Sequence, residues 1–391
     1  MFAATYGVVW LALVVGLTAG VLRVWPGLAR AVIGAEPADR QSALDGLRGL
    51  LALSVILHHG IIAHDYFGSG RWEAPPAKFD NLLGQGAVAL FFMSSAYLFW
   101  GRIIRRGTLD WNAFYRGRVR RLVPMYVATI LLLLTVVAVE TGFSLRVGLG
   151  DLLNQVARWF TFAFADAGDI NGLRGTGTIL SVIWTLRWEW MFYLALPFFA
   201  FLYGAISARW LFYGAVLIVS AATDSLHMAL YFASGGMAVH AVARWQESWW
   251  GRRIASVLGL IAGAVLVARF HDAYGLAPAL LLFPVFLAAL LASGPWSILR
   301  WRPLVFLGHI SYSVYLLHNP LIHIVAVSVF GPAGYATLGL PGLYLALLGV
   351  AGLTVAASTA TYLLIEKPFL GSGKALRWLA ILTRGDRAAE S

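Results

Sequence analysis

Residues 122–139 of the chain read LVPMYVATILLLLTVVAV, an apolar run between Arg121 and Glu140. An α-helix needs about 20 mainly apolar residues to cross the hydrocarbon core of a bilayer. This run, extended to 122–141, has the composition and length of such a helix. The strands of a membrane β-barrel would instead alternate in polarity. The stretch therefore predicts a helical integral membrane protein.

Similar stretches recur along the whole chain and predict an all-α, polytopic protein with about eleven transmembrane helices. The sixth stretch is short and is also compatible with a re-entrant pair formed with the seventh. The expected spans lie near residues 6–28, 46–64, 86–104, 122–141, 179–203, 210–223, 226–243, 254–270, 277–293, 304–328 and 342–365.

The composition leads to the same class. Of the 391 residues, 60 % are hydrophobic and 12 % are charged, whereas a soluble domain is usually about half apolar and about a quarter charged. These proportions exclude a water-soluble globular domain, a disordered chain and a fibrous protein. Because the chain has no cysteine, disulfides, thiolate metal sites and cysteine nucleophiles are excluded as well.

The basic residues set the expected orientation. The net charge of +11 would suggest nucleic-acid binding in a soluble chain, but cytoplasmic loops of membrane proteins are also rich in Lys and Arg. With eleven spans, the basic clusters all fall on one side. This predicts an outer N-terminus, a cytoplasmic C-terminus and no nucleic-acid partner. The clusters comprise Arg102, Arg105, Arg106, Arg116, Arg118, Arg120, Arg121, Arg244, Arg252, Arg253, Arg300, Arg302, Lys367, Lys374, Arg377, Arg384 and Arg387.

Three parts are expected along the chain: an extra N-terminal transmembrane helix in 1–34, a membrane domain in 35–370 and a basic cytoplasmic tail in 371–391. A cleaved signal peptide is the alternative for the first part. No positive charge precedes the apolar stretch, however, and Arg23 and Arg30 follow it, which is the reverse of the order in signal peptides. We therefore expect a retained helix.

The second span carries ionisable side chains at membrane depth, where a charge is costly and predicts a function. Arg48 and His59 are 11 residues apart, which places them within about 20° of the same helix face and about 16 Å apart along the axis. Asp45 lies one turn before Arg48 and can pair with it. A capped helix start with one buried, hydrogen-bonded histidine is the structural alternative.

Two further spans carry polar side chains. Glu189 lies among aromatic residues in the fifth span, either for function or as a structural ion pair between helices. Ser311, Tyr315 and His318 recur at i, i+4 and i+7 in the tenth span, so they share one face. Hydrogen bonding between helices would also explain that face.

The start of the fourth span carries a dense group of arginines that includes Arg118 and Arg121. Such a group can hold phosphates, although arginines at a helix end are also ordinary orientation signals. The sequence has no Gly-rich phosphate loop, His-Glu-x-x-His motif or Gly-x-Ser-x-Gly elbow. We expect no metal and no permanently bound cofactor.

Five motifs follow one another along residues 45–368. They are Leu44-Asp-Gly-Leu-Arg-Gly with His59, Phe91-Phe92 with Ser95, Arg118-x-x-Arg121-x-x-Pro124-x-Tyr126, Trp184-x-Leu-x-x-Glu189-x-x-Phe192-Tyr193, and Gly308-x-Ile-Ser311-Tyr312-x-x-Tyr315-Leu-x-His318-x-Pro320. Together they resemble the membrane-bound acyltransferase family 3, whose members acylate bacterial surface polysaccharides, O-antigens, Nod factors and some macrolides. Glu366-Lys-Pro368 also fits this family.

The resemblance implies roles for individual residues. His59 matches the family's catalytic histidine, paired with Arg48, and Glu189 matches the family's glutamate. Arg118 and Arg121 match the arginines associated with an acyl-CoA donor. A neutral imidazole can act as a general base on a hydroxyl, with Asp45 orienting Arg48. A covalent acyl-histidine is the alternative. Ser311, Tyr315 and His318 are expected to bind substrate or to serve as structural polar groups.

The expected function is therefore that of a membrane-bound O-acyltransferase. It would move an acyl group, with acetyl as the first expectation, from cytoplasmic acyl-CoA to a hydroxyl of a cell-surface or exported glycan or a lipid-linked sugar. Transfer of succinyl or a longer acyl group is one alternative. A polysaccharide transporter or flippase without catalysis is the other, in which the buried charges line a path.

Overall fold

The computed structural model describes residues 2–34, 41–107, 109–205, 209–222 and 228–370, and the regular elements among them are all helical. The expected all-α fold is therefore confirmed for the described part of the chain. The expected tail, 371–391, lies outside the described residues, as does the junction between the first two parts of the chain near residue 35.

The helices run in the following order. In the first half they are α1 (Phe2–Val24), α2 (Pro26–Ile33), α3 (Gln41–Ser69), α4 (Lys78–Arg106), α5 (Trp111–Glu140), α6 (Leu149–Trp159), α7 (Thr176–Ile179), η1 (Ser181–Ile183) and α8 (Trp184–Ala205). In the second half they are α9 (Arg209–Ala222), α10 (Ala229–Trp245), α11 (Trp249–Arg269), α12 (Leu276–Leu291), η3 (Gly294–Arg300), α13 (Arg302–His309), α14 (Ser311–Val325), η4 (Ala326–Phe330), α15 (Pro332–Ala336), α16 (Leu340–Thr361), η5 (Tyr362–Glu366) and α17 (Lys367–Leu370).

Seven helices of the described chain are long and apolar enough to cross a membrane, and an eighth span results if the bent pair of α12 and η3 counts as one. The helices α8, α9 and α10 coincide with the predicted fifth, sixth and seventh spans but are not among the seven. At 14 residues, α9 would be about 21 Å long, shorter than the hydrocarbon core. The protein is thus a multi-pass membrane protein, and the count of eleven spans stays a prediction.

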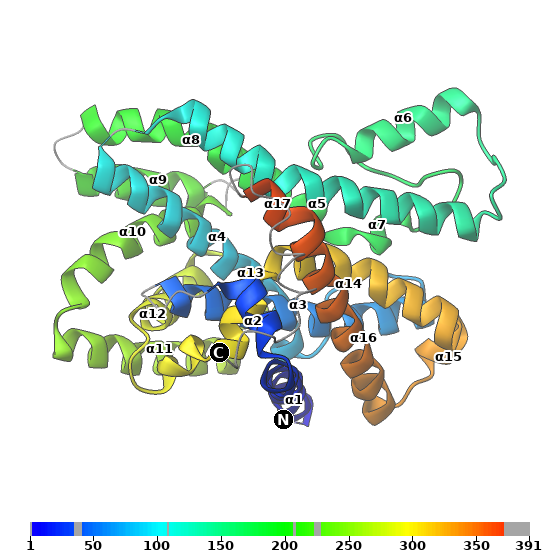
Figure 1. Ribbon diagram of the computed structural model, residues 1–391. Helices are drawn as coiled ribbons and strands as arrows, with labels where there is room; N and C mark the ends of the chain where they lie inside the picture. Colours follow the sequence, from blue (N-terminus) through cyan, green and yellow to red (C-terminus); the bar gives the residue numbers. More distant parts are fainter. Residues whose placement is uncertain (1, 35–40, 108, 206–208, 223–227, 371–391) are drawn as a thin grey trace, which may run out of the picture.

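Helix α3 lies at the centre of the bundle, packed against α4, α13, α14 and α16 (Figure 1). Its side chains from Ala43 to His58 are almost all buried. This explains why its apolar residues surround the helix rather than forming one stripe. The face that carries Arg48 and His59 is consequently turned toward other helices.

The glycines of the Asp45–Gly49 motif let two backbones touch. A Cβ atom at Gly46 would lie 1.7 Å from the carbonyl oxygen of Leu299, and one at Gly308 would lie 1.9 Å from that of Asp45. No larger residue fits at either position unless the helices separate. The contact fixes α13, and through it the start of α14, against the arginine-bearing end of α3.

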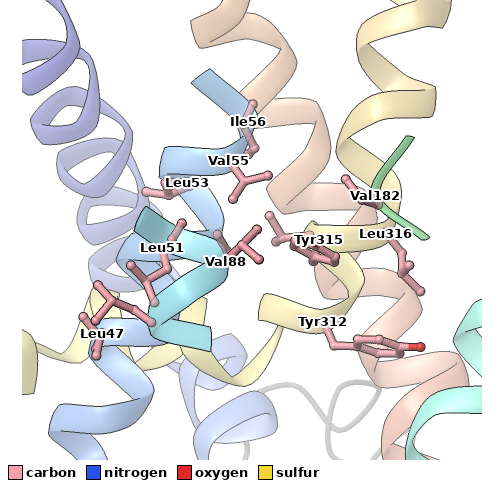
Figure 2. Close-up of a cluster of buried hydrophobic side chains, with 14 of the residues drawn as sticks. Leu47, Leu51, Leu53, Val55, Ile56, Val88, Val182, Tyr312, Tyr315 and Leu316 are labelled. Carbon is pink, nitrogen blue, oxygen red and sulfur yellow. The ribbon is translucent and has the colours of Figure 1, made fainter. Parts of the chain in front are cut away.

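Apolar side chains of α3, α4, η1 and α14 form the core beside this contact (Figure 2). Leu47 and Leu51 of α3 lie on one side of it, and Val88 of α4 and Tyr315 of α14 lie together near its centre. Tyr312 donates a hydrogen bond from its hydroxyl to the Leu122 carbonyl of α5. The core therefore sets the relative position of the helices that bear the candidate site.

The predicted span 304–328 is interrupted in the structure. Its chain forms α13 up to His309, turns at Ile310 and continues as α14. The turn comes two residues after Gly308, where the chain touches the backbone of Asp45. Ser311, Tyr315 and His318 all lie in α14, after the break.

Candidate active site

A cavity of about 310 Å³ opens between α3, α4, α5, α8 and α14 and collects most of the candidate residues. Along α4 its lining extends from Val88 to Arg102, which corresponds to about 21 Å at 1.5 Å per residue. Because arginine and hydroxyl groups that donate hydrogen bonds are prominent in its lining, we call it the donor pocket. Its lining comprises Arg48, Val88, Phe91, Phe92, Ser94, Ser95, Leu98, Phe99, Arg102, Arg118, Arg121, Leu122, Thr185, Leu186, Glu189, Tyr193, Ser311, Tyr312, Tyr315 and Leu370.

Four arginines, Arg48, Arg102, Arg118 and Arg121, line one end of the donor pocket, here called the arginine end. The Arg118 guanidinium lies 4.5 Å from the centre of the Phe99 ring, and among the described residues its buried Nε has no hydrogen-bond partner. A buried donor without a partner costs about 1–3 kcal/mol. The arrangement leaves this donor available to an acceptor other than the described residues.

Arg121 forms a salt bridge with Glu366, a residue to which the sequence analysis assigned no role. Its Nη1 lies 3.2 Å from Oε2 of Glu366, whose side chain is fully buried at the end of the π-helical η5. The hydroxyl of Ser313 donates to the other oxygen of Glu366, and Thr361 donates to Ser313 over 3.0 Å. Arg121 therefore brings a paired charge to the pocket, whereas Arg118 does not.

Arg48 lies in a looser group. Its Nη1 is 3.9 Å from Oδ1 of Asp45, one helical turn earlier, and Nε2 of His309 is 4.0 Å from the other oxygen of the same carboxylate. Both distances exceed those of charge-assisted hydrogen bonds. Asp45 thus balances Arg48 without fixing it, which leaves the guanidinium free to engage a ligand.

Glu189 faces the donor pocket rather than a basic partner. It accepts a hydrogen bond from the hydroxyl of Tyr193, one turn later in α8. Among the described residues, no Lys, Arg or His forms a salt bridge with it. The predicted alternative, an ion pair that joins two helices, does not occur there.

Tyr315 lines the donor pocket at the end nearer to His318, and we call this the tyrosine end. The hydroxyls of Tyr315 and Thr185 are 2.8 Å apart, and Thr185 donates to the Val182 carbonyl. Since the Thr185 proton is used in that bond, Tyr315 donates to Thr185. Ser311, one turn before Tyr315, lines the pocket with a buried hydroxyl that has no partner among the described residues.

His59 lies just beyond the tyrosine end, outside the pocket lining. Its Nδ1 is 3.1 Å from Nε2 of His318, and the His318 ring centre is 6.0 Å from that of Tyr315. On its other side, His59 stacks with Trp72 at 6.1 Å between ring centres. The candidate residues therefore fall into two groups, a pocket and a histidine pair, that meet at Tyr315.

His58 has a different environment from His59. Its Nδ1 donates to the Asp80 carbonyl over 2.8 Å, and its ring occupies the space that a Cβ at Gly84 would need. Both contacts are to α4. His58 thus ties α3 to α4.

Comparison with known proteins identifies the family. The model of the acyltransferase domain family (acyltransferase 3) matches residues 41–364, most of the chain. The chain belongs to this acyltransferase family. The resemblance deduced from the five motifs is confirmed.

Two curated relatives match parts of this acyltransferase. Nodulation protein 10 of Rhizobium leguminosarum bv. viciae is 28 % identical over 171 residues, which cover 42 % of this chain and 44 % of the relative. Protein 2 in picA locus of Rhizobium radiobacter is 31 % identical over 101 residues, or 25 % of this chain and 46 % of the relative. The chain thus spans less than half of either relative, and no solved structure was found to match it significantly.

The acyltransferase contains site residues that sequence reasoning passed over. Arg102 appeared only as an orientation signal and Glu366 only as part of a motif, and Trp72 was given no role. A carboxylate at the end of an apolar span could have marked Glu366, because charge at that depth is costly. Within the described residues no group of three or more His, Cys, Asp or Glu side chains could hold a metal ion.

Proposed function

We propose that this acyltransferase moves an acyl group, with acetyl as the first expectation, from acyl-CoA to a hydroxyl of an exported or cell-surface glycan or lipid-linked sugar. The observation that carries the proposal is the donor pocket, which has unpartnered cationic and hydroxyl donors in its lining and ends beside a histidine pair. The proposed setting is the bacterial inner membrane, with the arginine end toward the cytoplasm, in agreement with the positive-inside rule.

The arginine end suits the phosphates of coenzyme A. Arg118 and Arg102 supply cationic donors, Arg48 is loosely balanced, and Arg121 carries a paired charge. Guanidinium groups match phosphate oxygens in geometry as well as in charge. At about 310 Å³, the pocket is at the lower limit for small-molecule sites. It would therefore take the acyl end of the donor and leave the nucleotide at the mouth.

The tyrosine end suits the thioester. Ser311 has an unused hydroxyl there, and Tyr315 can turn its hydroxyl from Thr185 to a ligand. Such donors stabilise the negative charge that develops on a carbonyl oxygen during acyl transfer. Glu189 can accept a hydrogen bond from an amide of the donor's arm. Because Tyr315 separates this end from His59, the Tyr315 ring has to move when acyl transfer occurs.

His59 would activate the acceptor. In the first scheme its imidazole takes the proton of the sugar hydroxyl, the oxygen attacks the thioester carbon, and the C–S bond breaks. The departing thiolate takes the proton from the imidazolium, leaving an ester and free coenzyme A. In the second scheme Nε2 of His59 attacks the thioester carbon and the C–S bond breaks, which gives a cationic acyl-imidazolium and the thiolate of coenzyme A. The hydroxyl then attacks the acyl carbon, its proton passes to the thiolate, and the neutral imidazole leaves as the ester forms.

The test uses a strain that lacks the gene, complemented with the wild-type chain or with His59→Ala. Ester-linked acyl groups on surface glycans are measured by mass spectrometry. We expect the esters to disappear in the deletion strain, to return with the wild-type chain and to stay absent with His59→Ala, while the amount of glycan is unchanged. Loss of the glycan itself would favour the flippase, and an unchanged ester content in the deletion strain would reject the acyltransferase function proposed here.

A further inference from the structure

We propose that His318 is a positioning residue that holds His59 in the tautomer whose lone pair is on Nε2. The inference rests on the acyl transfer proposed above and adds a residue that acts on the base rather than on the substrate. It follows from two contacts along one line, from the Val314 carbonyl through His318 to His59, and from one contact within α3.

The first contact determines which ring nitrogen of His318 carries the proton. Its Nδ1 is 3.1 Å from the carbonyl oxygen of Val314, one turn earlier in α14. A carbonyl oxygen only accepts hydrogen bonds, so Nδ1 of His318 carries the proton. In a neutral imidazole the other nitrogen then has the lone pair. Nε2 of His318 is therefore an acceptor, and it points at His59.

The same argument determines which ring nitrogen of His59 carries the proton. Its Nδ1 is 3.2 Å from the Val55 carbonyl and 3.1 Å from Nε2 of His318. Both of these atoms are acceptors, so the proton of the neutral His59 ring lies on Nδ1, shared between them. Nε2 of His59 consequently has the lone pair that a base or a nucleophile needs.

The surroundings keep this arrangement intact. His318 is fully buried, so water does not compete for its Nε2. The His59 ring is bracketed by Trp72, stacked at 19° between ring planes, and by His58, whose ring lies edge-on at 4.9 Å. A ring flip of His59 would place Cδ2–H instead of Nδ1–H against the Val55 carbonyl and His318, and both hydrogen bonds would be lost.

The tautomer matters in both proposed schemes. A ring with its proton on Nε2 would present no lone pair to the acceptor hydroxyl or to the thioester. After His59 takes a proton or an acyl group on Nε2, the ring is cationic, and its Nδ1–H is then donated to the lone pair of His318. A hydrogen bond to a charged group in a dry interior is stronger than a neutral one. The same division of labour between a base and a group that orients it recurs in Ser-His-Asp triads.

The matched variants are His318→Gln and His318→Leu. Glutamine places an amide oxygen near the position of Nε2 and can accept from His59, whereas leucine fills a similar volume without an acceptor. In the complemented deletion strain we expect His318→Leu to lower acyl transfer per molecule of protein on the order of 10²-fold, as for a lost general base. We expect His318→Gln to retain most of the transfer. The affinity of both purified variants for coenzyme A should equal that of the wild-type chain.

Equal losses in the two variants would show that His318 only packs, and wild-type transfer by His318→Leu would overturn the inference. Neither result would bear on the proposed function, which is tested separately by the deletion strain and by His59→Ala. If His318→Leu fails to accumulate, ¹⁵N NMR of histidine-labelled wild-type chain in detergent decides. With His59 assigned through its loss in His59→Ala, a protonated Nδ1 and an unprotonated Nε2 would support the inference, and the opposite tautomer would reject it.

Discussion

The carboxylate of Glu366 lies 3.2 Å from the guanidinium of Arg121, with no part of the Glu366 side chain exposed. Arg118, one turn earlier in α5, has no such counter-charge in the described chain and rests on the Phe99 ring. The two arginines that the sequence grouped together therefore differ in chemistry. One is already neutralised within the protein, and the other is available to an incoming anion.

We expect the Arg121–Glu366 pair to contribute to stability. Removal of one partner from a buried ion pair leaves an uncompensated charge and typically costs about 3–5 kcal/mol. Arg121→Gln and Glu366→Gln should each lower the midpoint of thermal unfolding in detergent, and the double variant should recover part of the loss. Two single variants that unfold at the wild-type temperature would contradict this expectation.

We expect Arg118 to dominate the affinity for the donor. Arg118→Gln removes a charge-assisted hydrogen bond worth about 1.5–3 kcal/mol, which corresponds to an affinity for coenzyme A about 10- to 100-fold weaker. Arg120→Gln is the control, because Arg120 is exposed and does not line the pocket. Both affinities can be measured by titration of the purified chain with coenzyme A. Equal effects of the two substitutions would assign Arg118 to orientation alone.

We expect substitution of His59 to lower turnover and substitution of the adjacent His58 to lower stability. His59→Ala should fold normally but lose about 10²–10⁴-fold in turnover, the usual effect of a missing general base. His58→Ala should leave the Asp80 carbonyl without its donor and open a void beside Gly84, so it should lower thermal stability while most turnover remains. Turnover per molecule and unfolding temperature, measured on both variants, separate the two outcomes. An active His59→Ala protein would remove His59 from the mechanism.

We expect the arginine end and the loop that contains Gly172 to lie on opposite sides of the membrane. A reporter inserted at Gly107, between α4 and α5, should read cytoplasmic, and one inserted at Gly172, between α6 and α7, should read periplasmic. Insertion at either site falls in a connection rather than in a helix. A cytoplasmic reading at Gly172 would remove the predicted orientation and its outer N-terminus.

The sequence predicted the class of fold and the members of the site better than their arrangement. Helical periodicity placed Ser311, Tyr315 and His318 on one face of a helix, and in the structure that face connects the donor pocket to His59. Periodicity works here because all three residues belong to one regular helix. It also set Arg48 and His59 on a common stripe, but it could not show that Tyr315 would separate them.

The remaining features depend on contacts between residues far apart in the chain. Glu366 meets Arg121, and Nε2 of His318 meets Nδ1 of His59, across helices that the sequence does not orient relative to one another. The turn at Ile310 was missed for the same reason, since it lies next to the close backbone contacts made by Gly46 and Gly308. A single sequence shows hydropathy and spacing, and neither property identifies the side chain on another helix that a given residue contacts.

The contacts at the tyrosine end bear on the passage of ions as well as on the reaction. A continuous aqueous passage beside α14 would conduct ions, and each elementary charge that crossed would release about 2.3 kcal/mol per 100 mV of membrane potential. Tyr315 is hydrogen-bonded to Thr185, and the neighbouring His318 ring, which contacts His59, is fully buried. In the reaction proposed above, an acyl group would pass this point without an aqueous route that ions could follow.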